Sequence, residues 1–246
     1  MSGQTADSMR YGSTASVSDP FDITSFTGLE WFTTIKSYQQ APLLVAIGDS
    51  IIAGHPGNYS GAEDSLVNVP ANSITGQLEL LNSGYVSQNM GIGGEVSTEI
   101  KDRFTSDVVD LKPKLALING GINDISSGSV NKTTMLSNYT TMLDACVTNN
   151  IVPVVCKITP WTGGTNEQMQ DRDDRMSDLQ TLVATYSGAV WCDFDESIGK
   201  FRSGGDSGNL WDYKSGYSND NVHPNLTGYT AMAEVINLKI RAKYSF

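Results

Sequence analysis

The chain has 246 residues, of which 39% are hydrophobic, and a formal net charge of −11 at pH 7. This acidity argues against nucleic acid or an anionic membrane surface as a partner, and no apolar run approaches the ~20 residues of a membrane span. The length fits one α/β domain, and the cysteines, each within an apolar segment, suggest small buried hydrophobes rather than a disulfide framework: Cys146, Cys156 and Cys192.

The first forty residues differ in composition from the rest of the chain. Residues 1–20 are rich in Ser, Thr and Gly and predict a tail, whereas residues 21–40 are apolar enough to pack as an extension. The main domain is therefore predicted over residues 41–246. No apolar segment of a signal peptide is visible at the start of the sequence. The compartment is therefore left open, and secretion is favoured over the cytoplasm as the expectation.

Short apolar segments then alternate with helical patterns. Strands are predicted near residues 43–47, 85–89, 115–118, 152–157 and 190–194. Helices are predicted near residues 74–81, 96–104, 133–148 and 166–187, with a last helix from Pro224 to about residue 244. This alternation predicts a three-layer α/β/α sandwich around a five-stranded parallel sheet.

The first of these strands ends abruptly in Gly48-Asp49-Ser50. A buried parallel strand that turns sharply into a helix has this pattern, and it places Ser50 beside the N–H groups of the helix. A nucleophilic hydroxyl needs such surroundings.

Three further polar blocks follow in order. They read Asn-Met-Gly-Ile-Gly-Gly over residues 89–94, Gly-Ile-Asn-Asp over 121–124, and Asp-Asn-Val-His-Pro over 220–224. If the first strand lies between the second and third, as in the flavodoxin-like order 2-1-3-4-5, the loops that carry Ser50, Gly94 and Asn123 meet at the carboxyl edge of the sheet.

With these four blocks, the chain resembles the SGNH hydrolases, also called the GDSL esterase/lipase family. The blocks span residues 48–224, which is most of the chain. The third block reads Gly-Ile-Asn-Asp, where Gly-Gly-Asn-Asp is also common. The resemblance implies the three-layer fold, hydrolysis of esters through an acyl-enzyme, and no cofactor.

The residues themselves suggest which side chains would carry the chemistry. Ser50 needs a base, and the chain has two histidines, His55 and His223. His55 follows Ser50 too closely to aim its imidazole back at the hydroxyl, so we expect it to line the entrance. His223 comes from another loop and has Asp220 three residues before it to orient its ring, which predicts a triad of Ser50, His223 and Asp220.

For the oxyanion hole, the resemblance implies the backbone N–H groups of Ser50 and Gly94 and the side-chain amide of Asn123. Glycine allows a close approach to substrate, and a carboxamide donates without adding charge. Gly93 remains an alternative to Gly94. We expect Asp124, rather than Asn123, to cap the helix that follows.

Two other patterns in the chain, the spacing of Cys and His and a run of charged residues, do not indicate a metal site. No Cys/His cluster has zinc spacing, so no metal site is predicted. The run Asp171-Arg172-Asp173-Asp174-Arg175 is interpreted as a solvated helix face with an i,i+4 ion pair.

The substrate is less clearly indicated. The candidate substrate-binding residues are Trp161, Trp211 and His55, because aromatic residues on loops around a crevice can stack on sugar rings; anchoring of the loops is an equally good explanation. The segments 55–72 and 199–219 are polar and lack the apolar stripe of a lipase.

The sequence thus predicts a serine esterase for short acyl groups, with acetyl on a carbohydrate as the expected substrate. The alternatives are a thioesterase or lysophospholipase of the same fold, and a non-catalytic carbohydrate-binding domain. The expected partner is a small-molecule or glycan ester, and the oligomeric state is left open.

Overall fold

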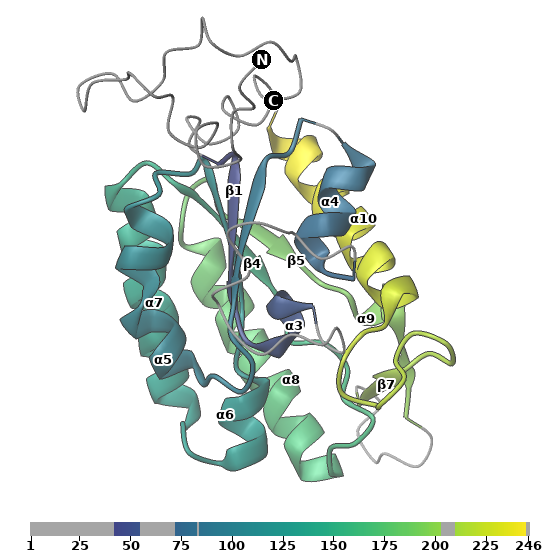
Figure 1. Ribbon diagram of the computed structural model, residues 1–246. Helices are drawn as coiled ribbons and strands as arrows, with labels where there is room; N and C mark the ends of the chain where they lie inside the picture. Colours follow the sequence, from purple (N-terminus) through teal and green to yellow (C-terminus); the bar gives the residue numbers. More distant parts are fainter. Residues whose placement is uncertain (1–41, 55–71, 83, 203–209, 245–246) are drawn as a thin grey trace, which may run out of the picture. The chain divides into compact units, whose positions relative to one another are not determined.

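The computed structural model describes residues 42–54, 72–82, 84–202 and 210–244. The predicted tail and extension, residues 1–40, lie outside this part of the chain. The described residues form one parallel sheet covered by helices on both faces (Figure 1).

The sheet has the strand order β2-β1-β3-β4-β5, and every pairing in it is parallel. This order confirms the prediction of a flavodoxin-like sheet. The strands are β1 (Leu44–Gly48), β2 (Ser87–Gly91), β3 (Leu115–Asn119), β4 (Val152–Cys156) and β5 (Val190–Cys192). Gly48 is in register with Gly91 on one side and Asn119 on the other, so the loops after β1, β2 and β3 leave the sheet together.

Two buried apolar clusters lie on opposite faces of the sheet because successive side chains of a strand point to opposite sides. Leu44 and Ala46 of β1 belong to the first cluster, and Val45 and Ile47 to the second. The first is covered by α4 (Ile74–Leu81), α9 (Asp195–Ile198) and α10 (Leu226–Lys243). The second is covered by α5 (Ser97–Asp102), the π-helix η3 (Thr105–Val109), α6 (Ile122–Ser127), α7 (Lys132–Thr148) and α8 (Asn166–Ala184).

The long helices and buried strands are placed close to their predicted positions. The second strand lies two residues later than predicted, because this edge strand reads Ser-Gln-Asn-Met-Gly and has no apolar run to mark its bounds. The helix predicted at 96–104 corresponds to α5, which ends at Asp102, and η3 follows it outside the predicted range.

Five short elements were not predicted: η3, α6, α9, β6 (Gly199–Phe201) and β7 (Trp211–Tyr213). The last two pair antiparallel outside the main sheet. Elements of three to six residues are too short to show a periodic pattern.

The interpretation of the charged run in α8 as a solvated face is wrong for its two arginines. Arg172 is 1% exposed and Arg175 is 5% exposed. Arg172 donates from Nη2 to the carbonyl of Ile158 at 2.6 Å and pairs with Asp195. Arg175 does form the expected i,i+4 pair with Asp171, at 2.8 Å. Arginine can be buried in this way when its donors find acceptors.

Candidate active site

Ser50 is the first residue of α3 (Ser50–Ala53), directly after β1. The carboxylate of Asp49 caps this helix by accepting from the backbone N–H of Ile51 at 3.0 Å. The short helix packs tightly on β2: a Cβ added to Gly91 would lie 2.1 Å from the nitrogen of Ala53. The glycine therefore allows α3, and with it Ser50, to sit at the carboxyl edge of the sheet.

His223 and Asp220 come from the loop before α10, and the structure brings both to Ser50. Nε2 of His223 lies 2.9 Å from Oγ of Ser50, and Nδ1 lies 2.6 Å from Oδ2 of Asp220. Oδ1 of Asp220 accepts from the backbone N–H groups of Val222 at 2.9 Å and His223 at 2.8 Å. Partial burial raises the pKa of Asp220, but these hydrogen bonds outweigh it and lower the pKa to about 2.

Tyr213 holds the loop that carries His223 in place. This side chain is 5% exposed, and its hydroxyl donates to the carbonyl of Val222 at 3.0 Å. Nothing local in the sequence distinguishes Tyr213 as an anchor of this loop. Its role follows from a contact between separate segments.

Gly94 and Asn123 lie on the two loops beside that of Ser50. Gly94 has a φ of +84°, a backbone conformation that favours glycine, and a Cβ added to Gly93 would lie 3.8 Å from Cβ of Ser50. Asn123, in the first turn of α6, donates from Nδ2 to the backbone carbonyl of Glu95 at 2.9 Å. The segment after β2 thus runs between Ser50 and Asn123.

Asp124 does cap a helix, but the expectation that it caps the helix that follows, predicted at 133–148, is wrong, because Asn131 caps that helix, α7. Its Oδ1 accepts from the backbone N–H of Ser97 at 2.7 Å and its Oδ2 from the Ser97 hydroxyl at 2.6 Å. Ser97 is the first residue of α5, whereas α6 begins after Gly121, which makes no side-chain cap. The carboxylate therefore joins the second loop to the third, a relationship that no local pattern reveals.

Asp49 is fully buried next to Ser50. Its Oδ2 has no hydrogen-bond partner within the described part of the chain. Burial raises its pKa to about 7, and the nearby carboxylates of Asp124 and Glu95 act in the same direction.

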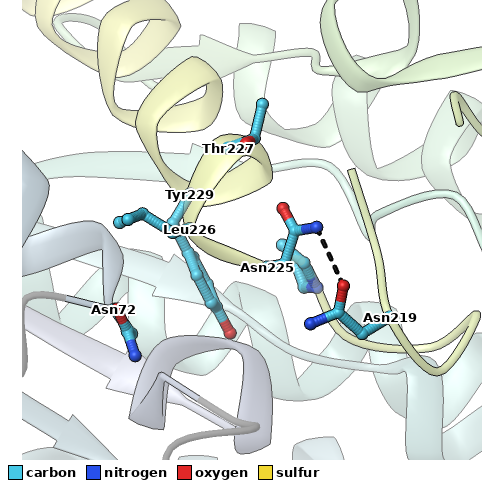
Figure 2. Close-up of a pocket in the computed structure, with 7 residues that line it drawn as sticks. Asn72, Asn219, Asn225, Leu226, Thr227 and Tyr229 are labelled. Atoms are coloured by element: carbon cyan, nitrogen blue, oxygen red, sulfur yellow. Dashed lines mark hydrogen bonds between the residues drawn. The ribbon is translucent and has the colours of Figure 1, made fainter. Parts of the chain in front are cut away.

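A cavity of about 370 Å³ lies at the N-terminal end of α10, next to the loop of His223 (Figure 2). Asn72 borders it and packs against the end of α3, since its carbonyl would lie 2.9 Å from a Cβ on Gly54. Its other lining residues are largely polar or aromatic: Asn219, Pro224, Asn225, Leu226, Thr227 and Tyr229. Two of these lining residues are joined by a hydrogen bond, from Nδ2 of Asn225 to Oδ1 of Asn219 at 3.1 Å.

Of the three residues suggested for substrate binding, the structure describes Trp161 and Trp211, and these two lie in different places. Trp161 is half-buried in a loop that is tied to the loop of His223, because the N–H of Gly163 donates to the carbonyl of Asn221 at 3.3 Å. Trp211 borders a separate cavity of about 580 Å³, which is also lined by Lys157 and Trp191. His55 lies outside the described residues.

The described residues also show the state of the cysteines, the grouping of possible metal ligands and the character of the helices. Cys146, Cys156 and Cys192 are buried free thiols, as expected. Within the described residues, no three His, Cys, Asp or Glu side chains gather as the ligands of a metal ion would. Of the described helices, none is long and apolar enough to cross a membrane.

Comparison with known proteins matches the chain to a family and a fold. The model of the GDSL-like lipase/acylhydrolase family matches residues 46–231. A GDSL-like lipase from Bacteroides thetaiotaomicron has a similar structure, with a TM-score of 0.65 and 19% identity over 87% of this chain and 98% of that one. A variant of an acetyl-xylooligosaccharide esterase from Geobacillus gives a TM-score of 0.60 and 19% identity, over 81% of this chain and 94% of that one.

These TM-scores show a common fold. One curated protein, an uncharacterized lipoprotein (YqeF) of Bacillus subtilis strain 168, is 35% identical over 83 residues, or 33% of this chain. The match spans 31% of the length of that lipoprotein.

Proposed function

Since the chain belongs to the GDSL-like lipase/acylhydrolase family, we propose that it is a serine esterase that removes short acyl groups, above all acetyl, from carbohydrates. The observation that carries this proposal is the continuous chain of hydrogen bonds from Ser50 through His223 to Asp220. Nucleophile, base and orienting carboxylate need this order and these distances for acyl transfer.

In the proposed reaction, Oγ of Ser50 attacks the acyl carbon while its proton passes to Nε2 of His223. The backbone N–H groups of Ser50 and Gly94 and the amide of Asn123 hold the negative oxygen of the tetrahedral intermediate. The intermediate collapses, and the departing alcohol takes the proton from Nε2. A water molecule then attacks the acyl-serine while Nε2 of His223 takes its proton. The bond between the acyl carbon and Oγ breaks, Oγ of Ser50 takes the proton back from Nε2, and the carboxylic acid leaves.

The proposed place for the acyl acceptor is the cavity at the N-terminal end of α10, which is bordered by Pro224, the residue after His223, and the lining of this cavity favours a polar acceptor. Its described walls carry the carboxamides of Asn72 and Asn219 and the hydroxyl-bearing Thr227, which can hydrogen-bond to sugar hydroxyls. Burial of an acyl tail would gain ~0.8 kcal/mol for each methylene, but it needs a long apolar surface, and Leu226 is the one aliphatic side chain among those walls apart from Pro224. One relative of the same fold is an acetyl-xylooligosaccharide esterase, so the fold accommodates this chemistry.

A fluorophosphonate probe and a series of esters test the proposal together. We expect the probe to label the wild type but not Ser50→Ala, and p-nitrophenyl esters to be turned over best from acetyl to butyryl and poorly by octanoyl. Acetylated xylan and acetylated sialic acid should release acetate. Absence of labelling would point to the non-catalytic binding domain, and a maximum at long-chain esters or acyl-CoA to a lysophospholipase or thioesterase.

Trp161 and Trp211 are proposed as contributors to glycan binding. Trp161→Ala or Trp211→Ala should then weaken turnover of an acetylated glycan more than turnover of p-nitrophenyl acetate. Because Trp211 borders the other cavity, an effect of Trp161 alone would place the sugar next to the loop of His223.

An extracytoplasmic location is also proposed, on the support of the partial match to a lipoprotein. Fractionation of the producing cells, with immunodetection of the chain, tests it. Recovery with cytoplasmic markers alone would contradict it.

A further inference from the structure

Arg103, at the end of α5, reaches the carboxyl ends of two neighbouring strands. Its Nη2 donates to the carbonyl of Gly48 at 3.0 Å, and its Nη1 donates to the carbonyl of Met90 at 2.7 Å. Gly48 ends β1 two residues before Ser50, and Met90 lies in β2 four residues before Gly94. A single side chain thus bridges the two strands where their functional loops leave the sheet.

The same guanidinium holds the residue that follows Gly94. Its Nε donates to both carboxylate oxygens of Glu95, at 3.0 and 2.8 Å, and Nη2 lies 2.6 Å from Oε2. The backbone carbonyl of Glu95 in turn accepts from Nδ2 of Asn123. Through Glu95, Arg103 is therefore connected to the third loop as well.

These contacts are well shielded from water. The side chains of Arg103 and Glu95 are each 14% exposed, and Asp107, which receives a hydrogen bond from Nη1 at 2.8 Å, is 19% exposed. Burial raises the pKa of Glu95, and the hydrogen bond from Arg103 opposes this rise. The planar guanidinium has donors in fixed directions, so it can span two carbonyls and a carboxylate at once, which the single ammonium of lysine cannot.

We propose that Arg103 is a positioning residue that sets the spacing between the nucleophile Ser50 and the oxyanion donors on Gly94 and Asn123. It acts through β1, β2 and Glu95 and does not touch the substrate. This inference rests on the proposed esterase function. A displacement of about 1 Å in such a site can cost on the order of 10²-fold in rate, so precise spacing has a measurable effect.

Kinetics of Arg103→Lys and Arg103→Ala on p-nitrophenyl acetate provide the first test. We expect kcat to fall by about 10- to 10²-fold while KM changes by less than about twofold, because the oxyanion contacts tighten in the transition state. Added guanidinium ion should restore part of the kcat of Arg103→Ala and none of the kcat of Ser50→Ala.

Arg175→Lys is the matched control. Arg175 also binds one carboxylate with two nitrogens and donates to a backbone carbonyl, that of Val130 at 2.8 Å, but Asp171 lies in α8 and Val130 follows α6, so these hydrogen bonds do not involve Ser50, Gly94 or Asn123. Arg175→Lys should lower the thermal midpoint and leave the kcat of the folded protein unchanged. An equal loss of kcat in Arg175→Lys and Arg103→Lys would overturn the proposal.

Amide chemical shifts, measured by NMR, report on the geometry of the site independently of catalysis. In Arg103→Lys, the backbone signals of Ser50 and Gly94 and the side-chain amide of Asn123 should shift, and in Arg175→Lys they should not. Unmoved signals in a folded Arg103→Lys protein would overturn the positioning role. A wild type without esterase activity would instead refute the proposed function, and shifted signals would still support the positioning by Arg103.

Discussion

The hydroxyl of Ser50 lies 2.9 Å from Nε2 of His223, although 173 positions separate the two residues in the chain. The direction of this hydrogen bond follows from the other side of the ring. The carboxylate of Asp220, whose pKa is lowered to about 2, accepts from Nδ1, so Nδ1 carries a hydrogen. In the neutral imidazole Nε2 is then the acceptor, and Ser50 donates to it. The ring is therefore oriented to take the serine proton.

Removal of the proposed nucleophile or the proposed base should abolish the proposed ester hydrolysis. Ser50→Ala and His223→Ala are each expected to lower kcat by on the order of 10⁴-fold or more, because neither step proceeds without both groups. Steady-state turnover of p-nitrophenyl acetate measures this, with circular dichroism as the check on folding. His55→Ala serves as the comparison and should be far milder; comparable damage from both histidine variants would show that the base is wrongly assigned.

Asn123→Ala should lower kcat by about 10²–10³-fold, the usual loss for one oxyanion donor, with little change in KM. The side chain also donates to the carbonyl of Glu95, so a modest decrease in the thermal midpoint should accompany the loss. A full kinetic analysis separates the two constants. A change in KM alone would mean that Asn123 binds the ground state of the substrate.

Tyr213→Phe should loosen the loop that carries His223. The variant loses the hydrogen bond from the tyrosine hydroxyl to the carbonyl of Val222, and we expect the free energy of unfolding to fall by about 1 kcal/mol. A several-fold decrease in kcat should follow, since the base is less well held. The control is Tyr186→Phe, which removes an exposed hydrogen bond to Asp144 on the surface. If both variants kept the wild-type kcat, Tyr213 would be a structural residue only.

Asp49→Asn should change how stability depends on pH. The pKa of Asp49 is raised to about 7 from the ordinary 3.8, so between these values the folded protein keeps a proton that the unfolded chain has lost. The free energy of unfolding then falls by up to about 4 kcal/mol as pH rises from about 4 to about 7, and Asp49 causes no further change above pH 7.

Asparagine can still cap α3 but does not titrate, so Asp49→Asn should show a flatter profile in urea unfolding between pH 4 and 7. Asn in place of the exposed Asp110 gives the comparison. Parallel profiles for wild type and Asp49→Asn would show that burial does not shift Asp49 as described.

Arg172→Met should be strongly destabilising, because it leaves the buried carboxylate of Asp195 without its arginine partner. Loss of one member of a buried ion pair costs about 3–5 kcal/mol, which urea unfolding can measure. Lys132→Met breaks an exposed pair with Asp178 and should change stability little. A small effect of Arg172→Met would mean that Lys157, which also pairs with Asp195, is a sufficient partner.

Local patterns in the sequence were enough to predict the main elements and the four blocks. The apolar run that ends in Gly48-Asp49-Ser50 specifies a buried strand and a turn, because both are encoded by the residues of this one short segment. The same reasoning, with the family resemblance, predicted the strand order and the approach of His223 to Ser50, since parallel strands end at one edge of the sheet.

Only the tertiary structure decided how the polar groups around those blocks are paired. Arg172 and Arg175 follow a pattern typical of a solvated helix face, yet both are buried against partners from other segments. Asp124 caps a helix that precedes it by 27 residues, and Arg103 joins strands whose carbonyls look alike in any sequence. Periodicity records which face of an element is apolar, but the partner of a buried charge depends on which segments the fold brings within 3 Å, and that information is spread over the whole chain.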